Sequence, residues 1–326
     1  MAQTIPLLTT LGLMVIDEIE DPSTNEVKEV LGGSGAWCSV GACMFLPKTK
    51  AKSICWKFQI GGDLSSEMEK QIIGWGINAE IEQMKGNETC RTKIKDKTGD
   101  SALAEYIRPK LAVEPHHLRG SIMLKAQCFH LVTPLDVLGQ EVRDLIQLRQ
   151  EVGMDRPLII WAPPSLTCHV RNLNCCMNAV RHVDVFSPNH IELLRLFGRE
   201  PSFDRNEIET LAGRFLDEGV GPTGNGSVVS RWLPAYYDSE HNNRPVVDTT
   251  GAGNAFLGGF IAGWVKTGDA VEAAAYGNVA SSFALEQVGP PVATGLDGEL
   301  WNGVCPRARL QEYRVRMGGS EQAVSA

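Results

Sequence analysis

Short apolar runs alternate along the chain with longer stretches in which apolar side chains recur every three or four residues. The short runs predict β-strands, and the longer stretches predict helices. The predicted strands are 7–16, 53–60, 127–132, 157–161 and 183–186. The predicted helices are 34–46, 64–75, 135–146, one that begins at Asn189, 253–266 and 269–287. Strands separated by helices are typical of an α/β fold with a parallel sheet and helices on both faces.

Two polar segments interrupt this alternation. Residues 17–31 and 88–112 carry few helix signals, and polar and apolar side chains alternate in them. They predict a small β accessory, a candidate lid, inserted into the α/β body. Residues 317–326 are small and polar, which predicts a disordered tail. The sequence therefore predicts a single α/β domain over residues 1–316 that carries a β lid.

Charge and cysteine content exclude several classes of protein. The 326 residues include 31 Lys and Arg against 39 Asp and Glu, a net charge of −8, which argues against a nucleic-acid or anionic-membrane binder. We find no apolar run long enough to span a membrane and no basic segment typical of a signal peptide. The nine cysteines include no CxxC pair. These features predict a cytoplasmic protein with reduced, buried thiols.

The glycine-rich run near residue 250 is the sharpest chemical signal. A short apolar run leads into Asp248-Thr249-Thr250, then Gly251-Ala252-Gly253, and then a predicted helix. Small residues at a helix N-terminus leave N–H groups free beside the positive end of the helix dipole, an arrangement that suits a phosphate. A tight turn without a ligand explains the same residues. The P-loop and Rossmann glycine patterns are both missing, which disfavours those two classes of nucleotide-binding protein.

Asp17 is a second candidate for ligand binding. It follows the first predicted strand, and the carboxyl ends of parallel strands are where open α/β sheets bind ligands. A structural role for this carboxylate at a helix N-terminus is the alternative.

The run Asp248–Phe256 resembles the C-terminal signature of the PfkB, or ribokinase-like, carbohydrate kinases. Further similarities follow in the order of that family and together cover residues 7–290. They are Gly12 with Asp17, Gly32-Gly33-Ser34-Gly35-Ala36, Ile60-Gly61-Gly62-Asp63, the Asn-x-x-Glu pair Asn189 and Glu192, and Asn278–Gly289.

The resemblance implies a ribokinase-like three-layer α/β/α sandwich with a small β lid. It also implies transfer of a phosphoryl group from ATP, with Mg²⁺, to a hydroxyl of a small molecule. In that family the lid often pairs between subunits, which predicts a homodimer.

Site residues are also implied by the resemblance. Gly251, Ala252 and Gly253 would stabilise the transferring group, and Asn254 would hold the acceptor hydroxyl. The acceptor would face Asp17, Gly33 and Trp37. The nucleotide would contact Asn189, Glu192, Thr223, Gly224, Gly226, Asn278 and Ala280. The metal would be held by Asn189 and Glu192, through water, and by Asp248.

Three departures from the family pattern bear on activity. The family has a catalytic Asp where this chain has Asn254, an amide that can orient a hydroxyl but cannot accept its proton. Trp37 stands where the family has a sugar-binding Asn, which favours a larger, less hydroxylated or stacking substrate. Core packing of Trp37 is the alternative. The family's Thr-x-Gly nucleotide segment is replaced by the glycine-rich loop 219–226.

Two functions therefore fit the sequence. The first is a kinase of a sugar, a nucleoside or a similar metabolite, in which phosphotransfer is slowed by Asn254. The second is a repurposed relative that binds a nucleotide or metabolite without phosphotransfer.

Overall fold

Two compact units make up the chain. The computed structural model describes residues 5–20, 26–94, 104–220, 230–238, 246–295 and 298–323. One unit combines the N-terminal residues up to Leu11 with Glu114–Ser230, and the other combines Gly12–Val113 with Arg231–Ala326.

The first unit is built on parallel strands in the order β10-β9-β8-β1. Their side chains are mostly buried, as expected for parallel strands covered on both faces. The strands are β1 (Leu8–Thr10), β8 (Cys128–Leu131), β9 (Leu158–Trp161) and β10 (Val185–Phe186). The α-helices are α3 (Leu138–Glu151), α4 (Leu173–Ala179), α5 (His190–Leu196) and α6 (Arg205–Asp217).

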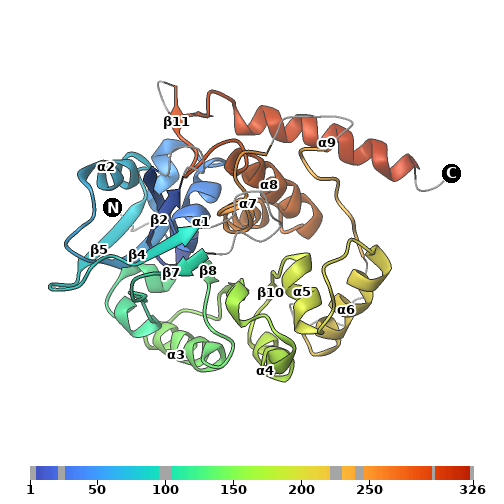
Figure 1. Cartoon of the computed structure of the whole chain (residues 1–326), viewed down its shortest axis with the longest axis horizontal. Coiled ribbons are helices and arrows are strands. Elements are labelled where there is room, and N and C mark those ends of the chain that lie inside the picture. Colours follow the sequence, from blue (N-terminus) through green and yellow to red (C-terminus); the bar gives the residue numbers. More distant parts are fainter. Residues whose placement is uncertain are drawn as a thin grey trace. The chain divides into compact units, whose positions relative to one another are not determined.

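The second unit contains a parallel strand pair, a mixed four-stranded sheet and five α-helices among its described residues. The parallel pair is β4 (Ile54–Ile60) with β5 (Asn78–Gln83), and a small hairpin joins β11 (Ala293–Thr294) to β12 (Leu300–Trp301). The helices are α1 (Ser34–Cys43), α2 (Ser66–Gly74), α7 (Ala252–Thr267), α8 (Ala270–Ala284) and α9 (Pro306–Ala323). Helices α7 and α8 lie side by side (Figure 1).

The four-stranded sheet, here called the accessory sheet, has the order β3-β2-β6-β7. Strand β2 runs antiparallel to β3 and parallel to β6, and β7 is antiparallel to β6. Its strands are β2 (Val15–Glu20), β3 (Val27–Gly32), β6 (Arg91–Ile94) and β7 (Ala104–Tyr106). The two polar segments that predicted a β accessory supply these strands. Its roles as a lid and as the contact of a homodimer stay predictions.

The predicted strand over 7–16 is in fact two strands, β1 and β2. Between them the backbone leaves strand pairing, because the indole N–H of Trp56 donates to the Gly12 carbonyl (2.9 Å) and the Leu13 N–H donates to Ser34 Oγ (3.1 Å). Asp17 consequently lies inside β2 and not at the end of the first strand.

Several elements were not predicted from the apolar pattern, namely β5, α4, α6 and α9. Helix α9 continues past Met317 to Ala323, where the sequence predicted a disordered tail. Residues 324–326 lie outside the described part.

The cysteines and the helices bear on two further expectations. All nine cysteines are free thiols, and all but Cys175 and Cys305 are buried. None of the described helices is both long enough and apolar enough to cross a membrane.

Candidate active site

The glycine-rich run forms a tight turn at the start of α7. Gly251 adopts a left-handed conformation (φ 78°, ψ −9°) at the N-cap of this 16-residue helix. Asp248 Oδ1 accepts the N–H of Thr250 (2.9 Å), which fixes the preceding turn. The first helical hydrogen bond runs from the Ala255 N–H to the Gly251 carbonyl (2.9 Å), so the N–H groups of Gly253 and Asn254 have no acceptor within the helix.

Glycines bring α1 into close contact with α7. A Cβ on Gly41 would lie 2.1 Å from the Ala255 carbonyl oxygen, and a Cβ on Gly258 would lie 2.0 Å from that of Cys38. These approaches hold the first turn of α7 against α1. The N-cap of helix α1 is Gly33, whose φ of 90° and closeness to the Leu13 carbonyl (2.3 Å from a Cβ) require glycine.

Trp37 lies beneath the glycine turn. Its side chain is 2% exposed and packs with Ala252, Ala255 and Ala284. The indole ring also lies against Gly251, and its Nε1 has no hydrogen-bond partner. The structure thus places Trp37 in the core beside the candidate anion site. Its contact with an acceptor stays a prediction.

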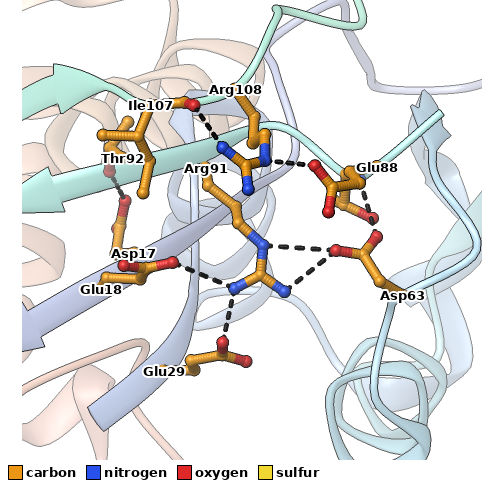
Figure 2. Close-up of polar contacts among 10 residues, drawn as sticks. Asp17, Glu18, Glu29, Asp63, Glu88, Arg91, Thr92, Ile107 and Arg108 are labelled. Carbon is orange, nitrogen blue, oxygen red and sulfur yellow. Dashed lines mark hydrogen bonds and ion pairs between the residues drawn. The ribbon is translucent and has the colours of Figure 1, made fainter. Parts of the chain in front are cut away.

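Asp17 projects from β2 and is hydrogen-bonded to the neighbouring strand β6. It is 5% exposed, and its Oδ1 accepts the hydroxyl of Thr92 on β6 (Figure 2). Burial raises the pKa of this carboxyl from 3.8 to about 7; the Thr92 bond lowers it, and the nearby charge of Asp248 raises it further. A carboxyl in this range can take up or release a proton near neutral pH.

Four buried polar atoms around this turn have no hydrogen-bond partner among the described residues. They are Trp37 Nε1, Asp248 Oδ2, Thr250 Oγ1 and Asn254 Oδ1. A buried polar group without a partner costs about 1–3 kcal/mol, so such groups gather where a ligand or ion satisfies them. Gly253 next to them is exposed, and nothing lies within 4 Å of a Cβ there.

This set of groups fits a phosphate with a metal ion and a hydroxyl. The N–H groups of Gly253 and Asn254, with the helix dipole, suit anionic oxygens. The carboxylate of Asp248 suits a hard cation, and the amide oxygen of Asn254 can accept a hydrogen bond from a hydroxyl. No cluster of three His, Cys, Asp or Glu side chains with metal-ligand geometry occurs among the residues that the structure describes.

Asn189 and Glu192 belong to the first unit, where they form a reciprocal capping box at the start of α5. Asn189 Oδ1 accepts the Glu192 N–H (2.8 Å), and Glu192 Oε2 accepts the Asn189 N–H (2.9 Å). The hydroxyl of Ser165 donates to Glu192 Oε1. Burial raises the pKa of the Glu192 carboxyl, and these hydrogen bonds oppose the rise. The pair therefore has a structural role, and its contact with a metal through water stays a prediction.

The other residues predicted to contact the nucleotide are not among the unpartnered polar groups around the Gly251 turn. Asn278 donates to the Tyr313 hydroxyl (2.8 Å) and so joins α8 to α9. Ala280 is buried against Gly259, where a Cβ would come within 2.7 Å of its methyl group. Thr223, Gly224 and Gly226 lie outside the described residues.

Two groups were not predicted from the sequence. Thr92 bonds Asp17 because β6 pairs with β2, a register that the sequence does not reveal. Thr250 has a buried, unpartnered hydroxyl. The position of Thr250 directly before the glycines is the feature of the sequence that could have identified it.

Comparisons with known proteins bear on the family and the fold. Residues 7–293 match the profile described as pfkB family carbohydrate kinase. Protein MAK32 of Saccharomyces cerevisiae is 28% identical over 346 residues, covering 97% of this chain and 94% of that protein.

Solved structures show the same fold at low identity. Ribokinase from Giardia lamblia aligns with a TM-score of 0.67 and 15% identity, over 96% of this chain and 99% of that one. An Escherichia coli protein assigned as a ribokinase II, in complex with ATP and Mg²⁺, aligns with a TM-score of 0.63 and 15% identity, over 95% and 99%. The fold is therefore the ribokinase-like α/β fold.

Proposed function

The chain belongs to the pfkB family of carbohydrate kinases, and we propose that it transfers the γ-phosphoryl group of ATP to a hydroxyl of a small molecule in the presence of Mg²⁺. Such a molecule would be a sugar, a nucleoside or a similar metabolite. The E. coli structure with ATP and Mg²⁺ supports the choice of nucleotide and metal.

One observation carries this proposal. The left-handed turn at Gly251 presents free N–H groups at the start of α7, beside buried polar atoms of Asp248, Thr250 and Asn254 that have no partner among the described residues. Donors aimed at developing negative charge contribute about 10²–10³ in turnover per donor in other enzymes.

The roles of the side chains follow from their chemistry. The N–H groups of Gly253 and Asn254 would stabilise charge on the transferring group. The amide oxygen of Asn254 would orient the acceptor hydroxyl, and Asp17 would accept a hydrogen bond from another hydroxyl of the acceptor. When bound, Mg²⁺ would neutralise phosphate charge, and the carboxylate of Asp248 would hold it. Positioning supplies most of the catalysis of phosphoryl transfer, so slow turnover without a catalytic Asp is expected.

A second function is favoured by Asn254. An amide at the base position fits a protein that binds a nucleotide or metabolite without transferring a phosphoryl group.

The two functions are separated by binding and turnover measured on the full chain. A ligand at 100 times its Kd stabilises the folded state by about 2.7 kcal/mol, so millimolar ATP with Mg²⁺ should raise the Tm by several degrees. Phosphotransfer to at least one member of a panel of sugars and nucleosides supports the kinase. A Tm shift without turnover on any of them supports the binding protein, and no Tm shift with ATP and Mg²⁺ contradicts the proposed kinase.

A further inference from the structure

Arg91, the first residue of β6, is the centre of an ion cluster at the base of the accessory sheet (Figure 2). Its Nε and Nη2 donate to Asp63 Oδ2 (3.2 and 2.9 Å). Its Nη1 donates to Glu18 (3.2 Å) and to Glu29 (2.5 Å). The Arg91 side chain is only 14% exposed, so these ion pairs are partly shielded from water.

The partners of Arg91 come from three other parts of the second unit. Glu18 on β2 and Glu29 on β3 face each other in the strand register, and Asp63 follows the end of β4. Asp63 also accepts the N–H of Thr89 (2.7 Å). One guanidinium therefore connects three strands of the accessory sheet to the end of β4.

The opposite face of the same strands carries the candidate acceptor site. Successive side chains of a strand point to opposite faces, so Thr92 points away from the ion cluster. Thr92 lies opposite Asp17 in the β2–β6 register and donates its hydroxyl to that carboxylate. The position of β6 thus determines both the ion cluster and the Thr92–Asp17 hydrogen bond.

We propose that Arg91 is a positioning residue, which fastens β6 to β2, β3 and the end of β4 and thereby holds Thr92 against Asp17. The part of this inference that concerns the acceptor rests on the proposed function. The part that concerns Asp17 does not.

Charge makes Arg91 hard to replace. One cation faces three carboxylates, so its removal would leave the acidic groups of Asp63, Glu18 and Glu29 close together without compensation. The Glu29, Asp63 and Glu18 carboxylates raise the pKa of Arg91 although burial opposes this. The planar guanidinium serves partners in several directions, which the single ammonium group of a lysine does not reproduce.

The test compares Arg91→Met with a matched control, Lys93→Met. Lys93 lies two residues further along β6, on the same face, and forms an ion pair with Glu20 (3.0 Å). The readout is the titration of the Asp17 carboxyl, followed by its ¹³C chemical shift and assigned with Asp17→Asn. Other titratable groups whose charges interact with Asp17 are Asp248, Cys90 and Tyr106.

The Thr92 hydrogen bond lowers the pKa of Asp17, so its loss should raise that pKa above about 7 in Arg91→Met. The pKa of Asp17 in Arg91→Lys should lie between its values in Arg91→Met and in the wild type. In Lys93→Met it should match the wild type. If Arg91→Met does not fold, Asp63→Asn instead removes the carboxylate that accepts two of the Arg91 hydrogen bonds, and it should shift the Asp17 titration in the same direction. An unchanged Asp17 titration in a folded variant of either kind overturns the proposal.

Kinetics separate this inference from the proposed function. Once an acceptor is found, Arg91→Met should raise the KM for the acceptor by about tenfold or more, with a smaller effect on the KM for ATP. Absence of phosphotransfer by the wild type would contradict the kinase and leave the Asp17 titration as the deciding measurement. An equal rise of both KM values would overturn the positioning role at the acceptor.

Discussion

The indole ring of Trp37 occupies the space that a side chain on Gly251 would need. A Cβ at position 251 would lie 2.0 Å from ring carbon Cδ2, far below any allowed contact. Gly251 also has a φ of 78°, a region that residues with a side chain rarely adopt. The aromatic residue and the glycine are therefore mutually dependent, and the shape of the candidate phosphate site depends on both.

Gly251→Ala should disrupt both the fold and ligand binding. Trp37 or the start of α7 must move to admit the methyl group, and we expect a loss of about 2–4 kcal/mol in the free energy of unfolding. Urea unfolding measures this loss.

Gly253→Ala is the matched control. Position 253 is helical and exposed, with nothing within 4 Å of a Cβ, so alanine there should preserve or raise stability by about 0.5–1 kcal/mol. It should nonetheless weaken ATP binding, because its methyl group would narrow the anion site. Equal stability of the two alanine variants would contradict this account of the turn.

Asn254→Asp should increase phosphotransfer. A carboxylate at the start of α7 could accept the proton of the acceptor hydroxyl, and a general base contributes about 10²–10⁴ in rate. We expect turnover with ATP and Mg²⁺ to rise by tens-fold or more against a panel of sugars and nucleosides. Asn254→Ser, which supplies no base, is the control. No increase with aspartate would indicate that the site has been adapted to binding alone.

Asp17→Asn should stabilise the protein at neutral and alkaline pH. The pKa of Asp17 rises from 3.8 when unfolded to about 7 when folded, because of burial. Between these values the folded chain keeps a proton that the unfolded chain has released, so this group makes the free energy of unfolding fall as pH rises. Above pH 7 the ionised Asp17 lowers the free energy of unfolding by its full amount, at most about 4 kcal/mol.

Urea unfolding at pH 5 and pH 8 tests this prediction. The stability advantage of Asp17→Asn over the wild type should be larger at pH 8. An advantage that is the same at both pH values would show that burial does not perturb the Asp17 carboxyl.

Asn189→Ala should lower the free energy of unfolding by about 1 kcal/mol through loss of the α5 cap. Asn189→Ser, which can still cap the helix, should retain most of that stability. Urea unfolding measures this difference. If Asn189 also orders the metal through water, both variants should weaken binding of ATP with Mg²⁺ to a similar extent. Full stability of the alanine variant would contradict the capping role, and unchanged nucleotide binding would contradict the metal role.

The sequence was most informative where the interacting groups are close along the chain. The Asx turn from Asp248 to Thr250 and the capping box of Asn189 with Glu192 involve residues two and three positions apart. Apolar runs likewise predicted β4, β8, β9 and β10 and most helices, because burial of a strand or helix face imposes its own period. The family resemblance was confirmed by the profile match.

Only the tertiary structure decided the environment of each candidate side chain. Asp17 and Thr92 are 75 residues apart, and Arg91 and Glu29 are 62 apart. Their contacts depend on strand order and register, to which local propensity contributes nothing. The surroundings of Asp17 and the Arg91 cluster follow from that pairing, and Trp37 is buried because α1 packs against the start of α7. The chain's local chemistry thus determined where a phosphate could bind, and long-range packing determined which side chains surround that place, because burial and charge depend on neighbours distant in sequence.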